Sequence, residues 1–237
     1  MNNITYTDWG LIEYKKAWDD QKVIFNKLMD QKLHIDKDKQ DTLLNNLIFC
    51  EHPHVYTLGK SGQQNNLLIS NDFLTKINAT YYEIDRGGDI TYHGPGQLVG
   101  YPIIDLEYFG ISLKRYIEMI EEAIIRTLRH YDIEAERLEG ATGVWIDTAY
   151  PEKTRKICAI GVKASRFVTM HGFAFNVNTD LDYFNHINPC GFVDKGVTSL
   201  RKEKGYKIDF EELKALCANS FAKVFDFKYH SFFTKND

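Results

Sequence analysis

A thiol and an amine, distant along the chain, are the residues best suited to covalent chemistry. Cys190 stands between Pro189 and Gly191, and these turn residues predict a loop that presents the thiol instead of burying it. A cysteine attacks as its thiolate, which a nearby cation favours. Lys156, at the start of a strand-like segment, is a candidate for that cation. The pair predicts an acyl-transfer site if the fold brings the two side chains together.

Two histidines remain alternative partners for the thiol, because a Cys–His pair is the commoner way to activate cysteine. His93 lies in a glycine-rich stretch, and His171 lies in a strand-like segment, where a supporting structural role is the alternative. Cys50, Cys158 and Cys217 lie in apolar segments and are expected to be small buried side chains. No two cysteines have C-x-x-C spacing, so neither a zinc site nor a disulfide framework is indicated.

The stretch 86–97, RGGDITYHGPGQ, has the composition of a loop shaped around a ligand. It contains four glycines and a proline in a chain with only 16 glycines and 5 prolines. Glycine permits positive φ and close approach to the main chain. The stretch lacks the Gly-Lys-Ser/Thr end of a P-loop, and it does not lead a G-x-G-x-x-G pattern into a helix. Its polar side chains favour the wall of a binding site over a plain tight hairpin.

Hydrophobic spacing predicts the elements that carry these residues. The mixture of helices and strands lacks strict βαβ alternation, which indicates a single domain over residues 1–237 of α+β class, with a mixed β-sheet flanked by helices. In a regular strand from residue 156, Lys156, Cys158 and Ile160 share one face, and Ala159 and Gly161 share the other. Helices are expected at 11–33, 71–77, 112–128 and 209–225, and a helical turn is expected at 181–187. The last three helices are expected to begin at caps, namely Ser70 or Asn71, Ser112 and Asp209. Strands are expected at 47–50, 55–58, 81–85, 97–106, 143–147, 156–163 and 169–178.

Composition narrows the partners and the location. The net charge is −4, which argues against bulk attraction to nucleic acid. No apolar run approaches the roughly 18 residues of a membrane span, and the N-terminus does not resemble a signal peptide, so a cytoplasmic protein without membrane attachment is expected. No exposed apolar seam is evident, which predicts a monomer. Six basic residues suggest either a docking rim or a solvated face: Arg166, Lys195, Arg201, Lys202, Lys204 and Lys207.

Four ordered motifs resemble those of the lipoyl(octanoyl) transferases, the octanoyl-[acyl-carrier-protein]:protein N-octanoyltransferases. The resemblance covers most of the chain, from about residue 47 to 207, and a chance match of four motifs in order is very improbable. Two departures are mild: Cys158 replaces a smaller residue, and the loop 148–155 is long. The motifs are RGGDITYHGPGQ (86–97), KICAIGV (156–162), HGFAFNVN (171–178) and NPCG (188–191).

The resemblance implies a biotin/lipoate protein ligase-like catalytic domain. It also implies octanoyl transfer from octanoyl-acyl carrier protein to the acceptor lysine of lipoyl domains, in 2-oxoacid dehydrogenases and the glycine cleavage H protein, without a cofactor or metal. The motif positions make Cys190 the acyl-thioester nucleophile and Lys156 the residue that lowers its pKa. The implied substrate contacts are Arg86, Gly87, Gly88, Asp89, Ile90, Thr91, Tyr92, His93, Ala159, Ile160, Gly161, Gly172, Phe173 and Ala174.

Three other functions fit the same kind of fold. An ATP-dependent lipoate or biotin ligase needs no cysteine nucleophile. An amidotransferase moves octanoyl or lipoyl groups between protein lysines, and a lipoyl-domain-binding module performs no chemistry. Acylation of Cys190 by octanoyl-acyl carrier protein is the property that separates the expected enzyme from these alternatives.

Overall fold

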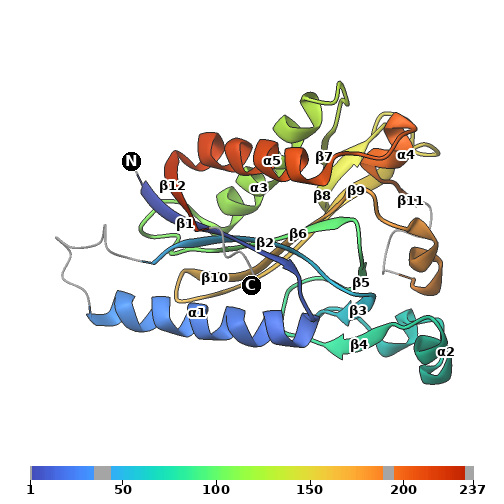
Figure 1. Ribbon diagram of the computed structural model, residues 1–237, viewed down its shortest axis with the longest axis horizontal. Coiled ribbons are helices and arrows are strands. Elements are labelled where there is room, and N and C mark those ends of the chain that lie inside the picture. Colours follow the sequence, from blue (N-terminus) through green and yellow to red (C-terminus); the bar gives the residue numbers. More distant parts are fainter. Residues whose placement is uncertain (1, 35–43, 189–194, 233–237) are drawn as a thin grey trace.

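A large mixed sheet forms the centre of the molecule (Figure 1). The computed structural model describes residues 2–34, 44–188 and 195–232. Within these residues the sheet order is β12-β1-β2-β6-β10-β9-β8-β7, and β11 pairs with β9. The strands are β1 (Asn2–Leu11), β2 (Asn46–Glu51), β6 (Gln97–Ile103), β7 (Glu136–Leu138), β8 (Ala141–Ile146), β9 (Arg155–Ser165), β10 (Val168–Asn176), β11 (Gly196–Val197) and β12 (Phe227–Phe232).

A smaller three-stranded sheet, of order β4-β3-β5, lies at one end of the large sheet. Its strands are β3 (Val55–Leu58), β4 (Thr80–Glu83) and β5 (Ile90–His93), and it is accompanied by η2 (Gln64–Asn66) and α2 (Asn71–Lys76). The glycine-rich stretch enters β5 and then passes through a turn at 94–96 into β6 of the large sheet. It therefore links two sheets, and the plain hairpin alternative is wrong.

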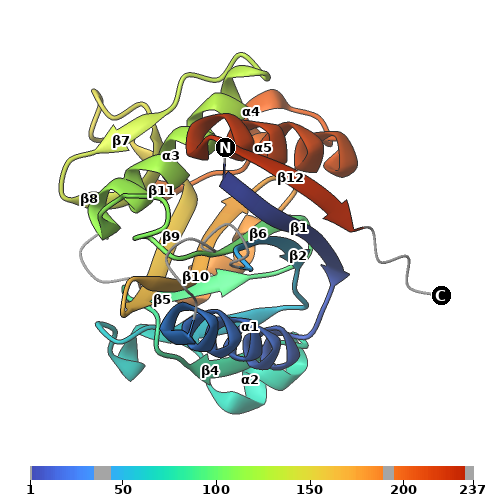
Figure 2. The ribbon, with the colours of Figure 1, turned by 90° about the vertical axis from the view of Figure 1, so that its left-hand side faces the viewer.

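Helices cover both faces of the large sheet (Figure 2). On one face, α1 (Tyr14–His34) packs Phe25 and Leu28 against strand residues that include Val99 and Met170. On the other face lie α3 (Leu113–Arg129) and α5 (Phe210–Phe225). Their apolar residues share a core with Phe49 and Phe175. The mixed sheet with flanking helices confirms the predicted fold class.

The predicted helix starts follow from side-chain caps. Ser70, Ser112 and Asp209 each accept hydrogen bonds from backbone N–H groups of the following turn, in α2, α3 and α5 respectively. Such caps satisfy backbone donors that have no partner within the helix. The cap of α2 is Ser70, not Asn71. None of the helices in the described part of the chain combines the length and apolar character of a membrane-spanning segment.

Several elements were not expected from the local sequence pattern. Leu11, expected in the first helix, ends β1, in which Ile4 and Tyr6 alternate as buried residues. β1 lies between β2 and β12 and is parallel to both. Six further elements of the described residues were not predicted, namely η2, β5, β7, β11, α4 (Leu200–Lys204) and β12.

The regular alternation expected for β9 is wrong at its start, because of a β-bulge. Val144 of β8 pairs with Cys158, but the next residue, Trp145, pairs with Lys156, so Ile157 is an extra residue. Both Ile157 and Cys158 enter the core beneath α3 and α5. Because a bulge inserts one extra residue, the side chains before it point to the opposite face of the sheet from the one that strict alternation predicts. Lys156 therefore lies on the same face as Ala159, opposite to Cys158.

Candidate active site

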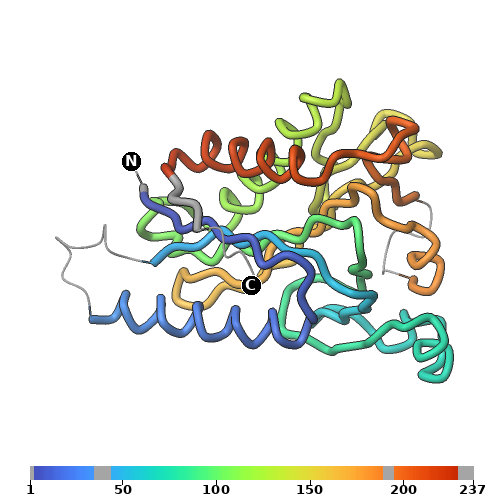
Figure 3. The backbone as a smooth tube through the Cα atoms, in the orientation of Figure 1, coloured from blue at the N-terminus to red at the C-terminus, as the bar shows by residue number. Residues whose placement is uncertain are grey.

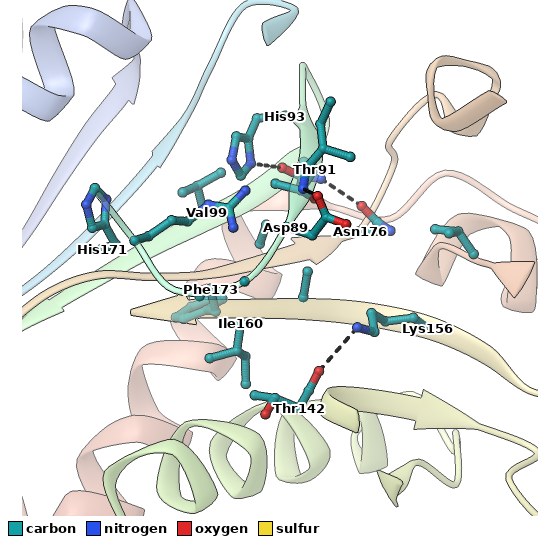
Figure 4. A pocket seen from close by; sticks show the side chains of 18 of the residues that line it. Asp89, Thr91, His93, Val99, Thr142, Lys156, Ile160, His171, Phe173 and Asn176 are labelled. Atoms are coloured by element: carbon teal, nitrogen blue, oxygen red, sulfur yellow. Dashed lines mark hydrogen bonds between the residues drawn. The ribbon is translucent and has the colours of Figure 1, made fainter. Parts of the chain in front are cut away.

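A pocket of about 370 Å³ lies between the α1 face of the large sheet and the glycine-rich stretch (Figure 4). Lys156 lies at one end, and His171 lies at the other (Figure 4). Much of the wall between them is apolar, which suits a hydrocarbon chain. The apolar lining includes Ile90, Val99, Ala159, Ile160, Phe173 and Ala174.

Two neutral groups in the described part of the chain contact the amine of Lys156. Its Nζ donates to the carbonyl oxygen of Thr142 at 3.2 Å and lies 4.5 Å from the centre of the Trp145 ring. Burial lowers the pKa of Lys156 to about 8, although the charge of Glu121 and the thiol of Cys158 act in the opposite direction. A lysine with a pKa near 8 can both donate and accept a proton near neutral pH.

His171, at the opposite end of the pocket, contacts an ion pair that lies outside the pocket lining. The Asp85 carboxylate lies 2.6 Å from Lys163 Nζ and 2.9 Å from His171 Nε2. The hydrogen bond from His171, followed by that from Lys163, holds the pKa of Asp85 far below its ordinary value. His171 has a φ of +63°, a conformation uncommon for a non-glycine residue, and its ring lines the pocket. Burial lowers its pKa despite the neighbouring carboxylate.

The glycine-rich stretch rests directly on β9 at Gly161. A Cβ added to Gly161 would lie 2.9 Å from the Gly87 carbonyl oxygen and 3.0 Å from Arg86 Cδ. The Gly87 N–H donates to the carbonyl of Val162 at 2.9 Å, which fixes this contact. The Arg86 guanidinium is buried and donates to the backbone oxygen and the hydroxyl of Thr57 at 2.8 and 3.1 Å. Glycine is therefore required at 161 by this close approach.

His93 is placed as a neutral hydrogen-bonding group. Burial, supported by the nearby His52, lowers its pKa to about 3. Its Nδ1 lies 2.8 Å from Gln97 Oε1, and Gln97 Nε2 donates to Asn176 Oδ1 at 2.9 Å. Asn176 in turn donates to the Thr198 carbonyl at 3.0 Å. This chain of bonds ties the glycine-rich stretch to β10 and to the segment after residue 194.

Cys190 itself lies outside the described residues, but the described chain on both sides of 189–194 borders the pocket. Before that segment come η3 (Leu181–His186) and Ile187, which lines the pocket. After it come Lys195 and β11, which also line it, and Val197 pairs with Lys156. η3 and β11 lie at the same end of the molecule (Figure 3).

Asn66 connects the segment that ends at Asn188 to the glycine-rich stretch. Its Nδ2 lies 2.9 Å from each carboxylate oxygen of Asp89, which lines the pocket. Its carbonyl oxygen accepts the Asn188 N–H at 2.8 Å. One side chain and its own backbone thus join a pocket carboxylate to the residue that directly precedes 189–194.

The structure brings most of the predicted site residues to this pocket. Gly87 and Tyr92 do not line it, and the Tyr92 hydroxyl instead lies 2.8 Å from His54 Nδ1. The predicted residues that line it are Arg86, Gly88, Asp89, Ile90, Thr91, His93, Lys156, Ala159, Ile160, Gly161, His171, Gly172, Phe173 and Ala174.

Part of the lining was not predicted from the sequence. Gln97 and Asn176 stand inside the quoted motifs, and this position was a signal that could have identified them. The other missed residues come from elements whose pocket contact no local pattern indicates. They include Tyr14, Ser61, Val99, Tyr101, Thr142, Trp145, Phe184 and Ile187.

The predicted basic rim is only partly assembled. Arg166 lies in the turn after the far end of β9, while Lys195 lies beside the start of that strand, so the two belong to opposite ends of the sheet. Lys204 donates to the Tyr131 carbonyl at 2.7 Å. Arg201 and Lys202 lie in α4 and are both exposed, as is Lys207 after that helix. The rim near the pocket is therefore smaller than expected.

The fold resembles solved lipoate protein ligases. A bipartite lipoate protein ligase from Thermoplasma acidophilum aligns with a TM-score of 0.71 at 14% identity, over 100% of this chain and 89% of that one. A lipoate-protein ligase A bound with ATP aligns with a TM-score of 0.67 at 13% identity, over 99% and 90%. At such identities these neighbours establish the fold.

Sequence relatives are much more similar. An octanoyltransferase of Parabacteroides distasonis is 55% identical over 225 residues, covering 95% of this chain and 100% of the relative. One of Bacteroides fragilis is 56% identical over 214 residues, covering 90% and 94%. The family model of the lipoyl protein ligase A/B catalytic domain matches residues 14–222. The chain therefore belongs to the lipoyl protein ligase A/B family, and within it to the octanoyltransferases.

Proposed function

We propose that this acyltransferase moves an octanoyl group from octanoyl-acyl carrier protein to the acceptor lysine of lipoyl domains, through a thioester on Cys190. Membership of the octanoyltransferases supports the reaction. The proposed acceptors are the lipoyl domains of 2-oxoacid dehydrogenases and the glycine cleavage H protein. Lys156 is the proposed proton carrier, and the proposed site requires neither metal nor nucleotide.

One observation carries the assignment of the nucleophile. The described residues on both sides of 189–194 line the pocket that contains Lys156, and Val197 pairs directly with that lysine. The described chain therefore reaches the pocket both before and after these six positions. Cys50, Cys158 and Cys217 are all buried, and burial raises the pKa of each thiol. A buried thiol with a raised pKa is a poor nucleophile, which favours Cys190.

In the first half-reaction, the Cys190 thiolate attacks the carbonyl carbon of the octanoyl thioester. The tetrahedral intermediate collapses as the bond from that carbon to the pantetheine sulfur breaks. Protonated Lys156 returns its proton to the leaving thiolate. One thioester replaces another, so the step needs no external source of energy, and the lysine ends it neutral.

In the second half-reaction, the acceptor lysine amine attacks the acyl-enzyme. Neutral Lys156 takes the proton that the attacking amine must lose, and the Cys190 thiolate leaves. The product is an amide, which is more stable than the thioester. A general base of this kind typically contributes roughly 10²–10⁴ in rate. The lowered pKa of Lys156, about 8, is matched to both proton transfers.

The apolar wall between Lys156 and Gly161 is the proposed acyl slot. Ala159 and Ala174 pair across β9 and β10 and leave room above the strands. The glycine-rich stretch closes the slot where it rests on Gly161. Each buried CH₂ contributes about 0.8 kcal/mol, so an eight-carbon chain is readily distinguished from acetyl.

Intact mass spectrometry with octanoyl-acyl carrier protein tests the proposal. The wild-type protein should gain one octanoyl group, located by peptide mapping at Cys190, and Cys190→Ala should gain none. Cys217→Ala is the matched control, because that thiol is buried in the core, and it should still be acylated. Addition of a lipoyl domain should then remove the acyl group from the enzyme.

Three outcomes contradict the proposal. Ligation of free lipoate with ATP by Cys190→Ala would identify a ligase. Transfer only from an acylated lipoyl domain would identify an amidotransferase. Binding of a lipoyl domain with no gain of mass from any donor would identify a non-catalytic module.

A further inference from the structure

The amine of Lys156 sits in a cradle built from β8. The Trp145 ring lies 4.5 Å from Nζ and is itself fixed by a 2.8 Å hydrogen bond from its Nε1 to the Ala141 carbonyl. Gly143, with a φ of +127°, lies beneath the lysine stem. A Cβ at this position would lie 2.6 Å from the Cys158 carbonyl oxygen and 3.4 Å from Lys156 Cε. The absence of a side chain there leaves the lysine room to lie along the strand.

A carboxylate from α3 reaches the same peptide group from the other side. The Gly143 N–H donates to Glu121 Oε1 at 3.0 Å, and the Thr142 carbonyl of that peptide accepts from Lys156 at 3.2 Å. Hydrogen bonds in series polarise one another. The negative charge of Glu121 therefore makes the Thr142 oxygen a stronger acceptor for an ammonium group. Glu121 is only 6% exposed and also accepts from Arg137 Nε at 3.0 Å.

We propose that Trp145 and Glu121, through the Thr142–Gly143 peptide, are positioning residues that hold the Lys156 amine in the pocket and stabilise its protonated form. The role of this cradle in turnover rests on the proposed function, in which Lys156 carries the proton. Neither residue touches the acyl group in this mechanism. Their effect is to keep the lysine a proton donor in the first half-reaction.

Opposing influences act on this amine. An aromatic face attracts an ammonium group, and a carboxylate does so through Coulomb's law, while burial favours the neutral amine. Burial lowers the pKa of the amine, whereas the Cys158 thiol, on the opposite face of β9, and Glu121 on α3 both act to raise it. Three further charged residues line the same pocket: Arg86 and Asp89 in the glycine-rich stretch, and Lys195 before β11. The cradle strengthens the interactions that favour the protonated amine of Lys156.

Competitive acetylation tests the cradle without relying on turnover. The wild-type protein is treated with a trace of acetic anhydride across a range of pH, and the acetylated fraction of the Lys156 peptide is measured by mass spectrometry. Only the neutral amine reacts, so the midpoint reports its pKa. Trp145→Leu and Glu121→Gln should each lower the midpoint by roughly half a unit to one unit. Trp145→Phe, which keeps a ring and protects the fold, should lower it less.

Matched controls separate this effect from a general loss of charge. Glu122 neighbours Glu121 on α3 and binds Arg126 and Arg137 at 2.9 and 3.1 Å, so Glu122→Gln should leave the midpoint unchanged. Tyr150→Leu removes an exposed ring near Lys153 and should also leave it unchanged. A midpoint that stays fixed or rises in both Trp145→Leu and Glu121→Gln overturns the proposal. An equal shift in Glu122→Gln also overturns it.

Turnover measurements distinguish a failure of the cradle from a failure of the proposed catalytic role of Lys156. If Lys156 carries the proton, the pH profile for breakdown of the acyl-enzyme should shift to lower pH in Glu121→Gln by the same amount as the labelling midpoint. A labelling shift without a change in this profile leaves the cradle intact and overturns the role of Lys156 in catalysis. An unchanged labelling midpoint overturns the cradle even if Lys156 is essential.

Discussion

Two lysines of β9 have different partners: Lys156 lines the pocket, and Lys163 lies outside its lining, near the His171 end. Lys156 donates to a backbone carbonyl and lies over an indole ring. Lys163 forms an ion pair with Asp85 at 2.6 Å, and that carboxylate also bonds His171. Burial lowers the pKa of Lys156 to about 8, which permits proton loss, whereas the contact between Lys163 and a carboxylate fixes the position of Asp85. The first arrangement suits chemistry, and the second suits structure.

One strand serves both purposes because its two ends are built differently. The bulge at Ile157 turns Lys156 toward the pocket. At the other end, the Asp85 cluster and the contact of Gly87 with Val162 anchor the glycine-rich stretch on β9 and β10. Charged pairs of this kind fix geometry more than they contribute free energy of folding. The wall of the slot is therefore fastened at the end remote from the proposed chemistry.

The largest expected difference is in turnover. Lys156→Met should reduce octanoyl transfer roughly 10²- to 10⁴-fold, because the general acid–base group is lost while a chain of similar length remains. Lys163→Met makes the same change at the lysine that pairs with Asp85, and it should reduce turnover far less. Single-turnover transfer from octanoyl-acyl carrier protein measures both. Equal losses in the two variants would remove the distinction between the lysines.

A smaller effect is expected from closing the slot. Gly161→Ala forces apart the Gly87 carbonyl and the Arg86 stem, and overpacking of this kind costs about 1–3 kcal/mol. The shifted loop should lower kcat/KM for octanoyl more than for hexanoyl. Ser165→Ala, exposed at the far end of β9, is the control and should change neither value. If the ratio of kcat/KM for octanoyl to kcat/KM for hexanoyl is unchanged, this contact does not determine the chain-length preference.

The smallest effect concerns stability. The folded-state pKa of Asp85 is depressed, so its ionised form stabilises the protein above its unfolded pKa of about 3.9, and this contribution is lost as the pH falls below that value. Asp85→Asn should lower the free energy of unfolding by about 1 kcal/mol at pH 7, reduced by solvent screening. The difference from wild type should shrink below about pH 4.

Urea unfolding at several pH values measures this difference. Asp19→Asn makes the same substitution beside Lys15 and Lys22, where all three side chains are exposed, and it should have little effect at any pH. A constant deficit of Asp85→Asn at all pH values would show that shape, not charge, determines its contribution.

Local chemistry predicted most of the elements and most of the residues that line the pocket. Periodic apolar residues and the caps Ser70, Ser112 and Asp209 are short-range signals, so the helices they begin were predicted correctly. The motif residues from Arg86 to His93 and from Lys156 to Gly161 are recognisable from residue type and order alone, and most of them line one pocket. The function followed from the same motifs.

Tertiary structure alone decided how the lysine faces and what surrounds it. Strict alternation predicts that Lys156 and Cys158 share one face of the strand. The bulge that separates them depends on the register of two strands, which no single segment encodes. Glu121 and Trp145 were seen only as helix and strand residues, because their contact with Lys156 requires α3, β8 and β9 to pack together. Residue type and spacing specify which groups are available, while packing between distant segments sets their distances and the pKa of the amine.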